Sequence, residues 1–359
     1  MKSTPASRSI LVTGGAGFVG SSICVHLART WADCQVVALD NLKRRGSELN
    51  LNRLKDAGVN FIHGDVRNRA DMDELPRMDV VIDCSAEPSV MAGLNGGVDY
   101  VVDTNLGGTQ NCLRIAARDQ ADLLFLSTSR VYPVDRLNRA CQEERGCFAI
   151  SPGTGIIGLG ERGVAEDFPL DGVRTLYGAT KLASELLIQE YAHLFGFRAV
   201  VNRCGVVAGP WQMGKTDQGF ALLWLSRHHW GLPLDYIGYG GTGHQVRDLL
   251  HVDDLCDLVV RQLDNMDRVA GNTYNVGGGK INSTSLKEFT TLCETISGRR
   301  IHIGSIPQER PGDLKLYITD NSKVTDATGW TPKRDVRAIL SDSFEWLKAH
   351  DAVLRTIMT

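Results

Sequence analysis

The sequence lacks any apolar run that approaches the about 18 residues a membrane-spanning helix needs. Its first residues, MKSTPASRS, are polar and contain no apolar core of a secretory signal, so we expect a short loose tail there. An excess of one charge is also missing: the formal net charge of −3 gives no global electrostatic reason to bind nucleic acid or an anionic membrane. We therefore expect a cytoplasmic protein that has neither of these as a partner.

No Cys-x-x-Cys pair occurs among the nine cysteines, which are odd in number and scattered. This usage fits reduced thiols in a cytoplasm, although Cys141 and Cys147 share one loop and could pair. His228 and His229 are adjacent but have no ligand partners at metal spacing, so we expect no metal site. The sequence also has no linker, repeat or low-complexity tract.

Short β-branched runs alternate with helical patterns over the first 200 residues. Continuous apolar strands between helices are typical of a parallel sheet that is covered on both faces. The pattern predicts an α/β fold with a doubly wound parallel sheet, the Rossmann type, and a smaller C-terminal mixed α/β substrate lobe. The expected strands are 9–14, 34–40, 59–65, 79–84, 122–128 and 197–203.

The domain division follows from the change of pattern near residue 204. We expect a NAD-binding Rossmann domain over 1–203 and a mainly substrate-binding lobe over 204–359. Within the second part, the segment of about 244–280 is expected to return to the Rossmann domain. Helices are predicted in the second half near 217–230, 252–265, 284–297 and 335–349. The stretch 133–173 is long and rich in Gly, Pro and charge, so it is either a lid or a surface insertion.

Three segments match the pattern G-x-G-x-x-G: GAGFVG at 15–20, GTGIIG at 153–158 and GYGGTG at 238–243. Three matches in one chain show how weak the bare pattern is. Only the first follows an apolar strand, opens an apolar-periodic helix and precedes an acidic residue at the end of the next strand. The other two are interpreted as a loop and a turn.

The first motif predicts a dinucleotide site. Gly15 permits the tight turn, Gly17 lets a pyrophosphate approach the backbone, and Gly20 lets the helix pack close to the sheet. The helix N-terminus offers free N–H groups to the phosphates. Asp40 would accept hydrogen bonds from the ribose hydroxyls and repel a 2′-phosphate, which favours NAD over NADP. NADP stays open because a cation of the neighbouring run could accept a phosphate: Lys43, Arg44 and Arg45.

The segment TLYGATKLASELLIQEYAHLFG, from Thr175 to Gly196, has helical periodicity and a glycine at its end. Tyr177 and Lys181 are four residues apart and would share one face of this helix. A free phenol has a pKa of about 10, and a cation nearby lowers it. The pair therefore predicts a base for alcohol oxidation, with Lys181 as the cation.

These motifs together resemble the extended short-chain dehydrogenase/reductase family, which contains the NAD-dependent nucleotide-sugar epimerases and dehydratases. The resemblance implies Thr128, Tyr177 and Lys181 as catalytic residues, and NAD as cofactor. It implies these cofactor-binding residues: Gly14, Gly15, Gly17, Phe18, Val19, Gly20, Asp40, Asn41, Asp65, Val66, Ser85, Ala86, Asn105, Ser127, Tyr177, Lys181 and Arg203. It implies these substrate-binding residues: Glu87, Thr128, Arg203, Asp217, Gln218, Gln245, Arg247 and Arg310.

Within the family, the stretches NLKRRGSELNLNRLKDAGVNFIHGDVRN, DQGF, GTGHQVRDLLHVDDL and YNVGGG resemble the CDP-paratose 2-epimerases, also called CDP-tyvelose epimerases. The resemblance implies that bound NAD oxidises C2 of a nucleotide-diphosphate sugar to a ketone and returns the same hydride to the other face. Glu87 stands where that group tends to carry Gln. CDP sugars are favoured, while UDP, GDP and dTDP sugars stay open.

Four alternatives remain at this point. A net reductase of the same family would consume nicotinamide stoichiometrically and exchange its cofactor freely. A 4-epimerase would use the same three catalytic residues with the sugar posed differently. A 4,6-dehydratase would need an acid pair after Thr128, where the chain has Ser129 and Arg130. A dinucleotide-sensing protein without catalysis would be expected to lose the tyrosine or the lysine. The resemblance also implies a homodimer formed by the helices near 98–118 and 175–195.

Overall fold

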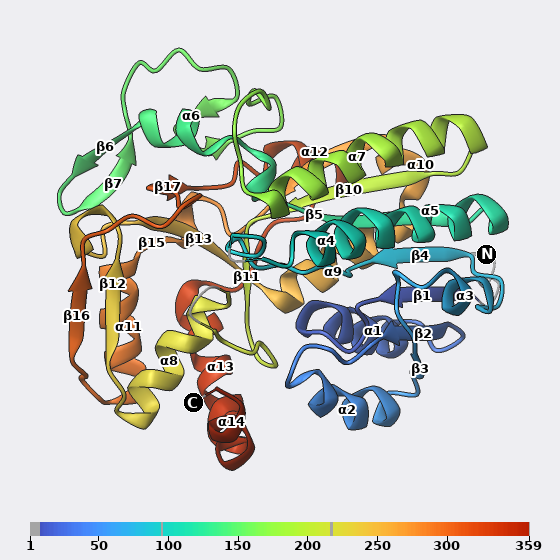
Figure 1. Cartoon of the computed structure of the whole chain (residues 1–359), viewed down its shortest axis with the longest axis horizontal. Helices are drawn as coiled ribbons and strands as arrows, with labels where there is room; N and C mark the ends of the chain where they lie inside the picture. The colour runs from blue at the N-terminus through green and yellow to red at the C-terminus, as the bar shows by residue number, and fades with distance from the viewer. Residues whose placement is uncertain (1–7, 95, 216–217, 359) are drawn as a thin grey trace.

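A parallel sheet of seven strands is the largest element of the computed structural model, which describes residues 8–94, 96–215 and 218–358 (Figure 1). The strand order is β14-β10-β5-β4-β1-β2-β3. The strands are β1 (Ser9–Thr13), β2 (Gln35–Asp40), β3 (Asn60–His63), β4 (Val80–Asp83), β5 (Asp122–Thr128), β10 (Ala199–Cys204) and β14 (Asn272–Val276). The strands predicted from the sequence are all present, and the doubly wound fold is confirmed.

Apolar side chains cover both faces of this sheet because successive strand residues point in opposite directions. In β1, Ile10 and Val12 join one core cluster, and Leu11 between them joins the other. The first cluster includes residues of α1 (Phe18–Thr30) and α9 (Val252–Asp264), and the second includes residues of α5 (Gly108–Asp119) and α7 (Leu176–Phe195). Smaller helical segments complete the two layers: α2 (Asn50–Asp56), α3 (Arg69–Asp73), α4 (Val98–Val102), α10 (Met266–Val269) and α12 (Ser322–Thr328).

The strand order places a topological switch at β1. β2, the next strand along the chain, pairs with β1 on one side, and β4 pairs with β1 on the other side. In doubly wound sheets, ligands bind in the crevice at the carboxyl ends of the strands at such a point. The turns after β1, β4 and β5 therefore hold the candidate site.

A second lobe packs beside the carboxyl edge of the sheet. Its core cluster joins α8 (Phe220–Trp230), α11 (Leu286–Ser297), α13 (Val336–Ala349) and α14 (Asp351–Met358). Its strands are β11 (Val206–Ala208), β12 (Leu234–Ile237), β13 (Val246–His251), β15 (Ser283–Ser285), β16 (Ile303–Ile306) and β17 (Leu316–Tyr317). Between these elements the chain returns to the Rossmann sheet through α9 and β14.

The insertion 133–173 is folded and packs on the second lobe. It contains α6 (Val134–Arg139) and two short hairpins, β6 (Cys141–Glu144) with β7 (Cys147–Ile150) and β8 (Leu159–Gly160) with β9 (Gly163–Val164). Figure 1 shows it in green above β13 and β17. Backbone hydrogen bonds from Phe148 to His244 and from Val164 to Ile318 attach it there.

Two negative expectations can be compared with the structure. Within the described ranges, no helix combines the length and the apolar character needed to cross a bilayer. All nine cysteines are free, including Cys141 and Cys147.

The second and third glycine motifs have the conformations expected from the sequence. The motif at 153–158 lies in a loop with positive φ angles at Gly153, Gly155 and Gly158, and the motif at 238–243 contains a 3₁₀ turn.

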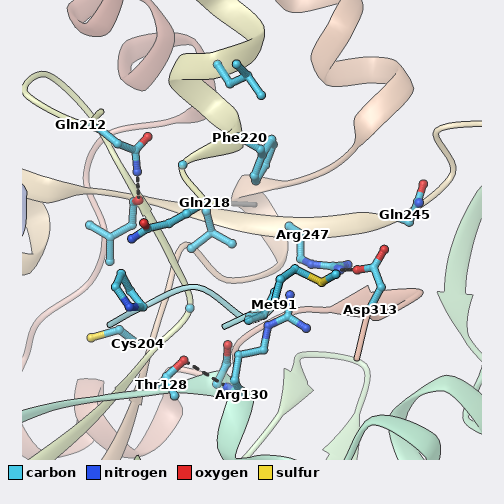
Figure 2. Close-up of a pocket in the computed structure, with 18 of the residues that line it drawn as sticks. Met91, Thr128, Arg130, Cys204, Gln212, Gln218, Phe220, Gln245, Arg247 and Asp313 are labelled. Atoms are coloured by element: carbon cyan, nitrogen blue, oxygen red, sulfur yellow. Dashed lines mark hydrogen bonds and ion pairs between the residues drawn. The ribbon is translucent and has the colours of Figure 1, made fainter. Parts of the chain in front are cut away.

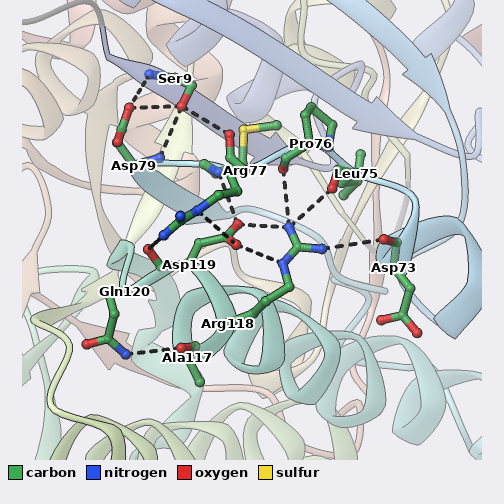
Figure 3. A network of polar contacts seen from close by, with 11 residues as sticks. Ser9, Asp73, Leu75, Pro76, Arg77, Asp79, Ala117, Arg118, Asp119 and Gln120 are labelled. Atoms are coloured by element: carbon green, nitrogen blue, oxygen red, sulfur yellow. Dashed lines mark hydrogen bonds and ion pairs between the residues drawn. The ribbon is translucent and has the colours of Figure 1, made fainter.

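A polar network holds the end of α5 against the loop that leads into β4 (Figure 3). The Asp119 carboxylate accepts a hydrogen bond from the Met78 amide and two from the Arg118 guanidinium. Arg118 also donates to the carbonyls of Leu75 and Pro76. This network lies at the edge of the sheet where β4 begins, and it fixes the strand whose other end carries part of the site.

A buried ion pair joins α7 to β10. Arg203 donates to Glu185 through Nε and Nη2, with the shortest contact at 2.7 Å, and both side chains are almost fully buried. Glu185 also accepts a hydrogen bond from Ser127, and Arg203 donates to the Tyr132 hydroxyl. Removal of one partner from such a pair leaves an uncompensated buried charge.

Replacing Glu185 by Gln should lower the free energy of unfolding by about 3–5 kcal/mol, because Arg203 stays charged and buried. Urea unfolding of the two proteins measures this difference. The control is Asp73→Asn, which removes a surface partner of Arg69 and should cost at most about 1 kcal/mol. Equal losses in the two variants would contradict the structural role given to the buried pair.

Candidate active site

The turn between β1 and α1 is built for close backbone approach. A Cβ at Gly15 would lie 2.7 Å from Ala38, and one at Gly20 would lie 2.1 Å from the Gly14 carbonyl oxygen. Gly14 itself has a φ of +63°, which disfavours a side chain. A Cβ at Gly17 would meet only the Gly14 oxygen, at 3.1 Å, so its outer side is open. The turn therefore has the geometry that a dinucleotide pyrophosphate requires.

Helix α1 begins directly after this turn, with Gly17 as its N-cap and no side-chain hydrogen bond to the first amides. These amides are donors that a phosphate can use. Phe18 and Val19, in the first turn of α1, line the large pocket described below. On these observations the residues present fit the cofactor expected from the sequence.

Asp40 lies at the end of β2 beside this turn. Its carboxylate accepts hydrogen bonds from the amides of Ala16, at 3.1 Å, and Leu42, at 2.8 Å. Burial raises its pKa, while these amide hydrogen bonds oppose the rise. Asn41 donates to Asp65, at 2.9 Å, so the ends of β2 and β3 are tied together. The Arg67 hydrogen bond lowers the pKa of Asp65 to about 2.

The three cations that follow Asp40 make contacts elsewhere. Lys43 lies 3.2 Å from the centroid of the Tyr100 ring. Arg44 donates to the side chain of Gln218 and to the carbonyl of Met213. Arg45 donates to the carbonyl of Thr356, at 2.5 Å. These contacts leave the Asp40 carboxylate as the charge that faces the turn, which favours NAD over NADP.

Asn105 connects the loop after β4 to α7. It lies in a π-helical turn over Asp103–Gly107 and is fully buried. Its side chain accepts from the Glu87 amide, at 2.7 Å, and donates to the Glu87 carbonyl and to Thr180. The Asn105 side chain therefore positions this loop instead of pointing into the pocket. In the same loop Ser85 is buried, and Ala86 lines the pocket.

Tyr177 lies in the first turn of α7, where Thr175 caps the helix by accepting from the Gly178 amide. Gly196 ends the helix with a φ of +77°, as the sequence predicts. Burial raises the pKa of Tyr177 to about 12, and a hydrogen bond with Thr128 opposes the rise. Thr128 ends β5, and both side chains line the same pocket. The structure therefore brings the expected hydroxyl pair together.

Lys181 has a different environment from the one expected. Its ammonium donates to the Leu126 carbonyl, at 2.9 Å, and lies 4.3 Å from the centroid of the Phe125 ring. Burial lowers the pKa of Lys181. The Arg130 charge is one of the groups that oppose the rise in the pKa of Tyr177. That Lys181 is the cation acting on Tyr177 therefore stays a prediction.

The pocket has a volume of about 600 Å³ and reaches from Tyr177 into the second lobe (Figure 2). Gln245 and Arg247 enter it from the β13 side, and Arg310 lies in the loop before β17. Arg247 donates to the Asp313 carboxylate, at 3.0 Å, and to the Leu314 carbonyl. Gln218 and Gln245 also line the pocket, so most of the expected substrate residues lie together.

Some expected site residues lie elsewhere. The guanidinium of Arg203 donates to Glu185 and Tyr132, and Arg203 is not among the residues that line the pocket. The prediction that it binds cofactor and substrate is therefore wrong. Val66 packs in the core beneath Gly108. Ser127 lines the pocket but donates to Glu185. Asp217 falls outside the described residues, and 133–173 contributes no side chain to the pocket lining found in the described ranges.

The structure adds pocket residues that sequence reasoning missed. Arg130 follows the end of β5, and Cys204 is the last residue of β10. Gln212, Phe220 and Asp313 come from the second lobe. The position of Arg130 just after the strand-end Ser/Thr run was a signal available in the sequence. The lobe residues carry no local pattern, because their place depends on how the lobe packs.

Comparison with known proteins gives a consistent result. The model of the NAD dependent epimerase/dehydratase family matches residues 10–277. CDP-paratose 2-epimerase of Salmonella typhi is 28% identical over 94% of this chain and 98% of its own length. dTDP-glucose 4,6-dehydratase of Actinoplanes sp. is 30% identical over 95% and 98%. The structure of UDP-glucuronic acid 4-epimerase from Bacillus cereus, in complex with UDP-glucuronic acid and NAD, has a TM-score of 0.77 at 25% identity and covers 95% of this chain and 99% of that one.

Replacing Asp40 by Ser should weaken the discrimination against NADPH. Loss of the carboxylate removes an acceptor for the ribose hydroxyls and a charge that repels a 2′-phosphate. The dissociation constant of NADPH divided by that of NADH should therefore fall by about tenfold or more. A tenfold change corresponds to about 1.4 kcal/mol of binding free energy. Fluorescence titration of protein freed of resident nucleotide measures both constants. Asp56→Ser, at an exposed position at the end of α2, is the control. An unchanged ratio in the Asp40 variant would exclude this carboxylate as the selecting group.

Proposed function

The chain belongs to the NAD-dependent epimerase/dehydratase family, and from this premise we propose that it is an epimerase acting on C2 of a nucleotide-diphosphate sugar, with a CDP-sugar of the paratose or tyvelose type as substrate. Its cofactor is NAD, which when bound accepts a hydride from the substrate carbon and returns it. The single observation that carries the proposal is the pocket that joins the Tyr177–Thr128 pair to the arginines of the second lobe.

The proton chemistry is assigned to residues of this chain. Oxidation of an alcohol releases a proton from oxygen, so a base must lie at the reacting hydroxyl. Tyr177 would accept that proton as the ketone forms and give it back after the sugar presents its other face. The Thr128 hydroxyl, hydrogen-bonded to Tyr177, would hold the same oxygen in place. Because the hydride returns to the sugar, the cofactor should remain bound between turnovers.

The opposite part of the pocket contains side chains that could bind a diphosphate group. The guanidinium groups of Arg247 and Arg310 could form charge-assisted, bidentate bonds to phosphate oxygens. Arg247 is held in place by Asp313 and the Leu314 carbonyl. Gln218 and Gln245 would contact the sugar or the nucleotide.

Elimination chemistry is less consistent with the residues after β5. A dehydratase must protonate a leaving hydroxyl and remove a proton from the adjacent carbon. The residues that follow Thr128 are Ser129 and Arg130, and neither is an acid. A 4-epimerase remains the nearest alternative, because the same pair would serve a sugar bound with C4 at the cofactor. The C2 assignment is supported by the similarity to the 2-epimerase.

The proposal also places the enzyme in the cytoplasm, in line with its nine free cysteines. We infer a homodimer as well, formed through α4, α5 and α7. Leu186 and Leu194 on α7 are 58% and 74% exposed, and two turns of helix separate them, so they share one face. Exposed apolar side chains gathered on one helix face indicate a contact with another chain.

A panel of nucleotide sugars that includes CDP-paratose tests the substrate and the reaction. Purified protein without added cofactor should give a C2-inverted product by NMR, with no net change in absorbance at 340 nm. An inversion at C4 instead would support the 4-epimerase. Turnover only with added cofactor, and with stoichiometric NADH change, would replace epimerase by oxidoreductase.

The variant Tyr177→Phe separates catalysis from sensing. Loss of a positioned proton acceptor should lower kcat by about 10²- to 10⁴-fold, while NAD content of the purified protein stays within about twofold of the wild type. Assay of turnover and of released nucleotide on the same preparation gives both values. A non-catalytic dinucleotide sensor would show no turnover in either protein and no effect of the substitution on its function.

The dimer is tested by the double variant Leu186→Glu/Leu194→Glu. Two buried charges at the interface should convert the wild-type dimer to a monomer of 39.3 kDa, measured by light scattering. The control Ile281→Glu, at a position that is 89% exposed and distant from α7 in sequence, should leave the dimer intact. A wild-type mass equal to one chain would exclude the dimer.

A further inference from the structure

The insertion that contains α6 and β6 to β9 packs directly behind the pocket, although none of its residues is among those that line the described part of it. Phe148 of β7 donates its amide to the His244 carbonyl, at 3.0 Å, just before β13. Leu137 of α6 shares a core cluster with Leu314, just before β17. The insertion therefore contacts both segments from which charged side chains enter the pocket in the second lobe.

Asn138, on α6, is the residue through which the insertion holds the segment before β17. Its side-chain oxygen accepts a hydrogen bond from the Lys315 amide, at 2.8 Å, and its Nδ2 donates to the Asp313 carbonyl, at 3.1 Å. A backbone amide can only donate and a carbonyl can only accept, so these two partners determine the orientation of the Asn138 side chain. The segment is thus fixed at two backbone groups.

Tyr239 adds a third contact at the same place. Its hydroxyl donates to the Asp313 carbonyl, at 2.9 Å, and accepts from Nδ2 of Asn138, at 3.0 Å. On the opposite side of the segment, the Lys315 carbonyl accepts from the Val246 amide, at 2.9 Å. The segment is therefore held between the insertion and β13.

The groups fixed in this way are the ones that orient Arg247. Its Nη2 donates to the Asp313 carboxylate, at 3.0 Å, and to the Leu314 carbonyl, at 2.7 Å. The same carboxylate accepts from the Leu314 amide, at 2.8 Å. Figure 2 shows the side chains of Arg247 and Asp313 next to each other at the pocket wall. A guanidinium that is already held in one orientation loses less conformational freedom when it binds phosphate oxygens.

The turn that carries Arg310 is fixed from both ends of the same segment. The Asp313 amide donates to the Arg310 carbonyl, at 3.2 Å. Between them, the Gly312 carbonyl accepts from the Arg130 guanidinium, at 2.9 Å, and a Cβ at Gly312 would lie 2.3 Å from the methyl carbon of Thr175. The Rossmann domain thus holds the start of this segment, and the insertion holds its end.

We propose that Asn138 is a positioning residue for diphosphate recognition. It fixes the backbone on both sides of Leu314, and this backbone and the Asp313 carboxylate orient the Arg247 guanidinium in the pocket. The proposal rests on the proposed function, in which Arg247 binds a nucleoside diphosphate group. It gives the insertion a task in substrate binding that it performs from behind the pocket wall.

Calorimetric titration of the holoenzyme with CDP, UDP, GDP and dTDP tests the proposal without turnover. For the diphosphate that binds most tightly, Asn138→Ala should raise the dissociation constant by about threefold to tenfold, the range that corresponds to one hydrogen bond. Tyr239→Phe removes only the hydroxyl that contacts Asp313, so it should raise the constant by a smaller factor while leaving no cavity. NAD content should stay within about twofold of the wild type in both variants.

The matched control is Arg136→Gln, also on α6. Arg136 pairs with Asp171, at 2.6 Å, and both residues belong to the insertion. Its loss disturbs the insertion without touching the segment before β17, so the dissociation constant should change by less than about twofold.

A double-mutant cycle with Arg247→Lys separates positioning from general stability. Lysine keeps the charge but cannot reach Asp313 and Leu314 with one planar fork. If Asn138 acts through Arg247, then Asn138→Ala should change the dissociation constant by less than about twofold in the Arg247→Lys background. A merely structural role of Asn138 would give the same factor in both backgrounds.

The proposal is overturned by unchanged binding in both Asn138→Ala and Tyr239→Phe, by an equal loss in Arg136→Gln, or by equal factors in the two backgrounds of the cycle. Absence of binding for all four diphosphates would overturn the proposed function as well. Coupling between Asn138 and Arg247 in a protein that shows no C2 inversion would retain the role of Asn138 and remove the proposed substrate. C2 inversion without coupling would retain the substrate and remove the role.

Discussion

The ionisation of a phenol inside a largely apolar pocket is the constraint on which the rest of this site depends. Burial raises the pKa of Tyr177 to about 12, and each group around it either opposes or adds to that effect. Thr128 and Arg130 are held at the end of β5, whereas Tyr177 begins α7, so the chemistry requires these two elements to meet with little tolerance. Gly178 permits this contact, because no other residue would fit against the Arg130 carbonyl.

The surrounding structure can be understood as support for that contact. Asn105 links the loop after β4 to α7 through Thr180, and the buried pair of Glu185 and Arg203 links α7 to β10. None of these four side chains is among the residues that line the pocket, and their contacts fix the orientation of the helix that carries Tyr177 and Lys181. The second lobe then determines what else enters the pocket, since Gln245, Arg247 and Asp313 all belong to it. The base is fixed in one lobe, and the residues for substrate recognition lie in the other. The substrate can therefore differ between proteins of this fold while the base stays the same.

The parts that local sequence patterns determine were predicted from the sequence. Strands of the parallel sheet follow from apolar runs, and the turn at Gly15, Gly17 and Gly20 follows from a motif in the correct context. Helical spacing correctly placed Tyr177 and Lys181 on one helix, but spacing cannot show where a long, flexible side chain ends. The ammonium of Lys181 donates a hydrogen bond to the Leu126 carbonyl, and Arg203 forms an ion pair with Glu185. Buried charges require such partners, and only the tertiary structure supplies them. Arg130 directly follows the strand-end Ser/Thr run, but its place in the pocket depends on the contact between this turn and α7, which no local pattern shows.

The reaction itself is tested most directly by following the hydrogen on C2. A CDP-sugar carrying deuterium at C2 would be incubated with the purified enzyme and its resident NAD, and the product analysed by NMR and mass spectrometry. Oxidation at C2 followed by return of the same hydride predicts an inverted product that retains the deuterium and a cofactor that is not consumed. Inversion with loss of the deuterium to solvent, or retention of C2 configuration with inversion at another carbon, would contradict the account.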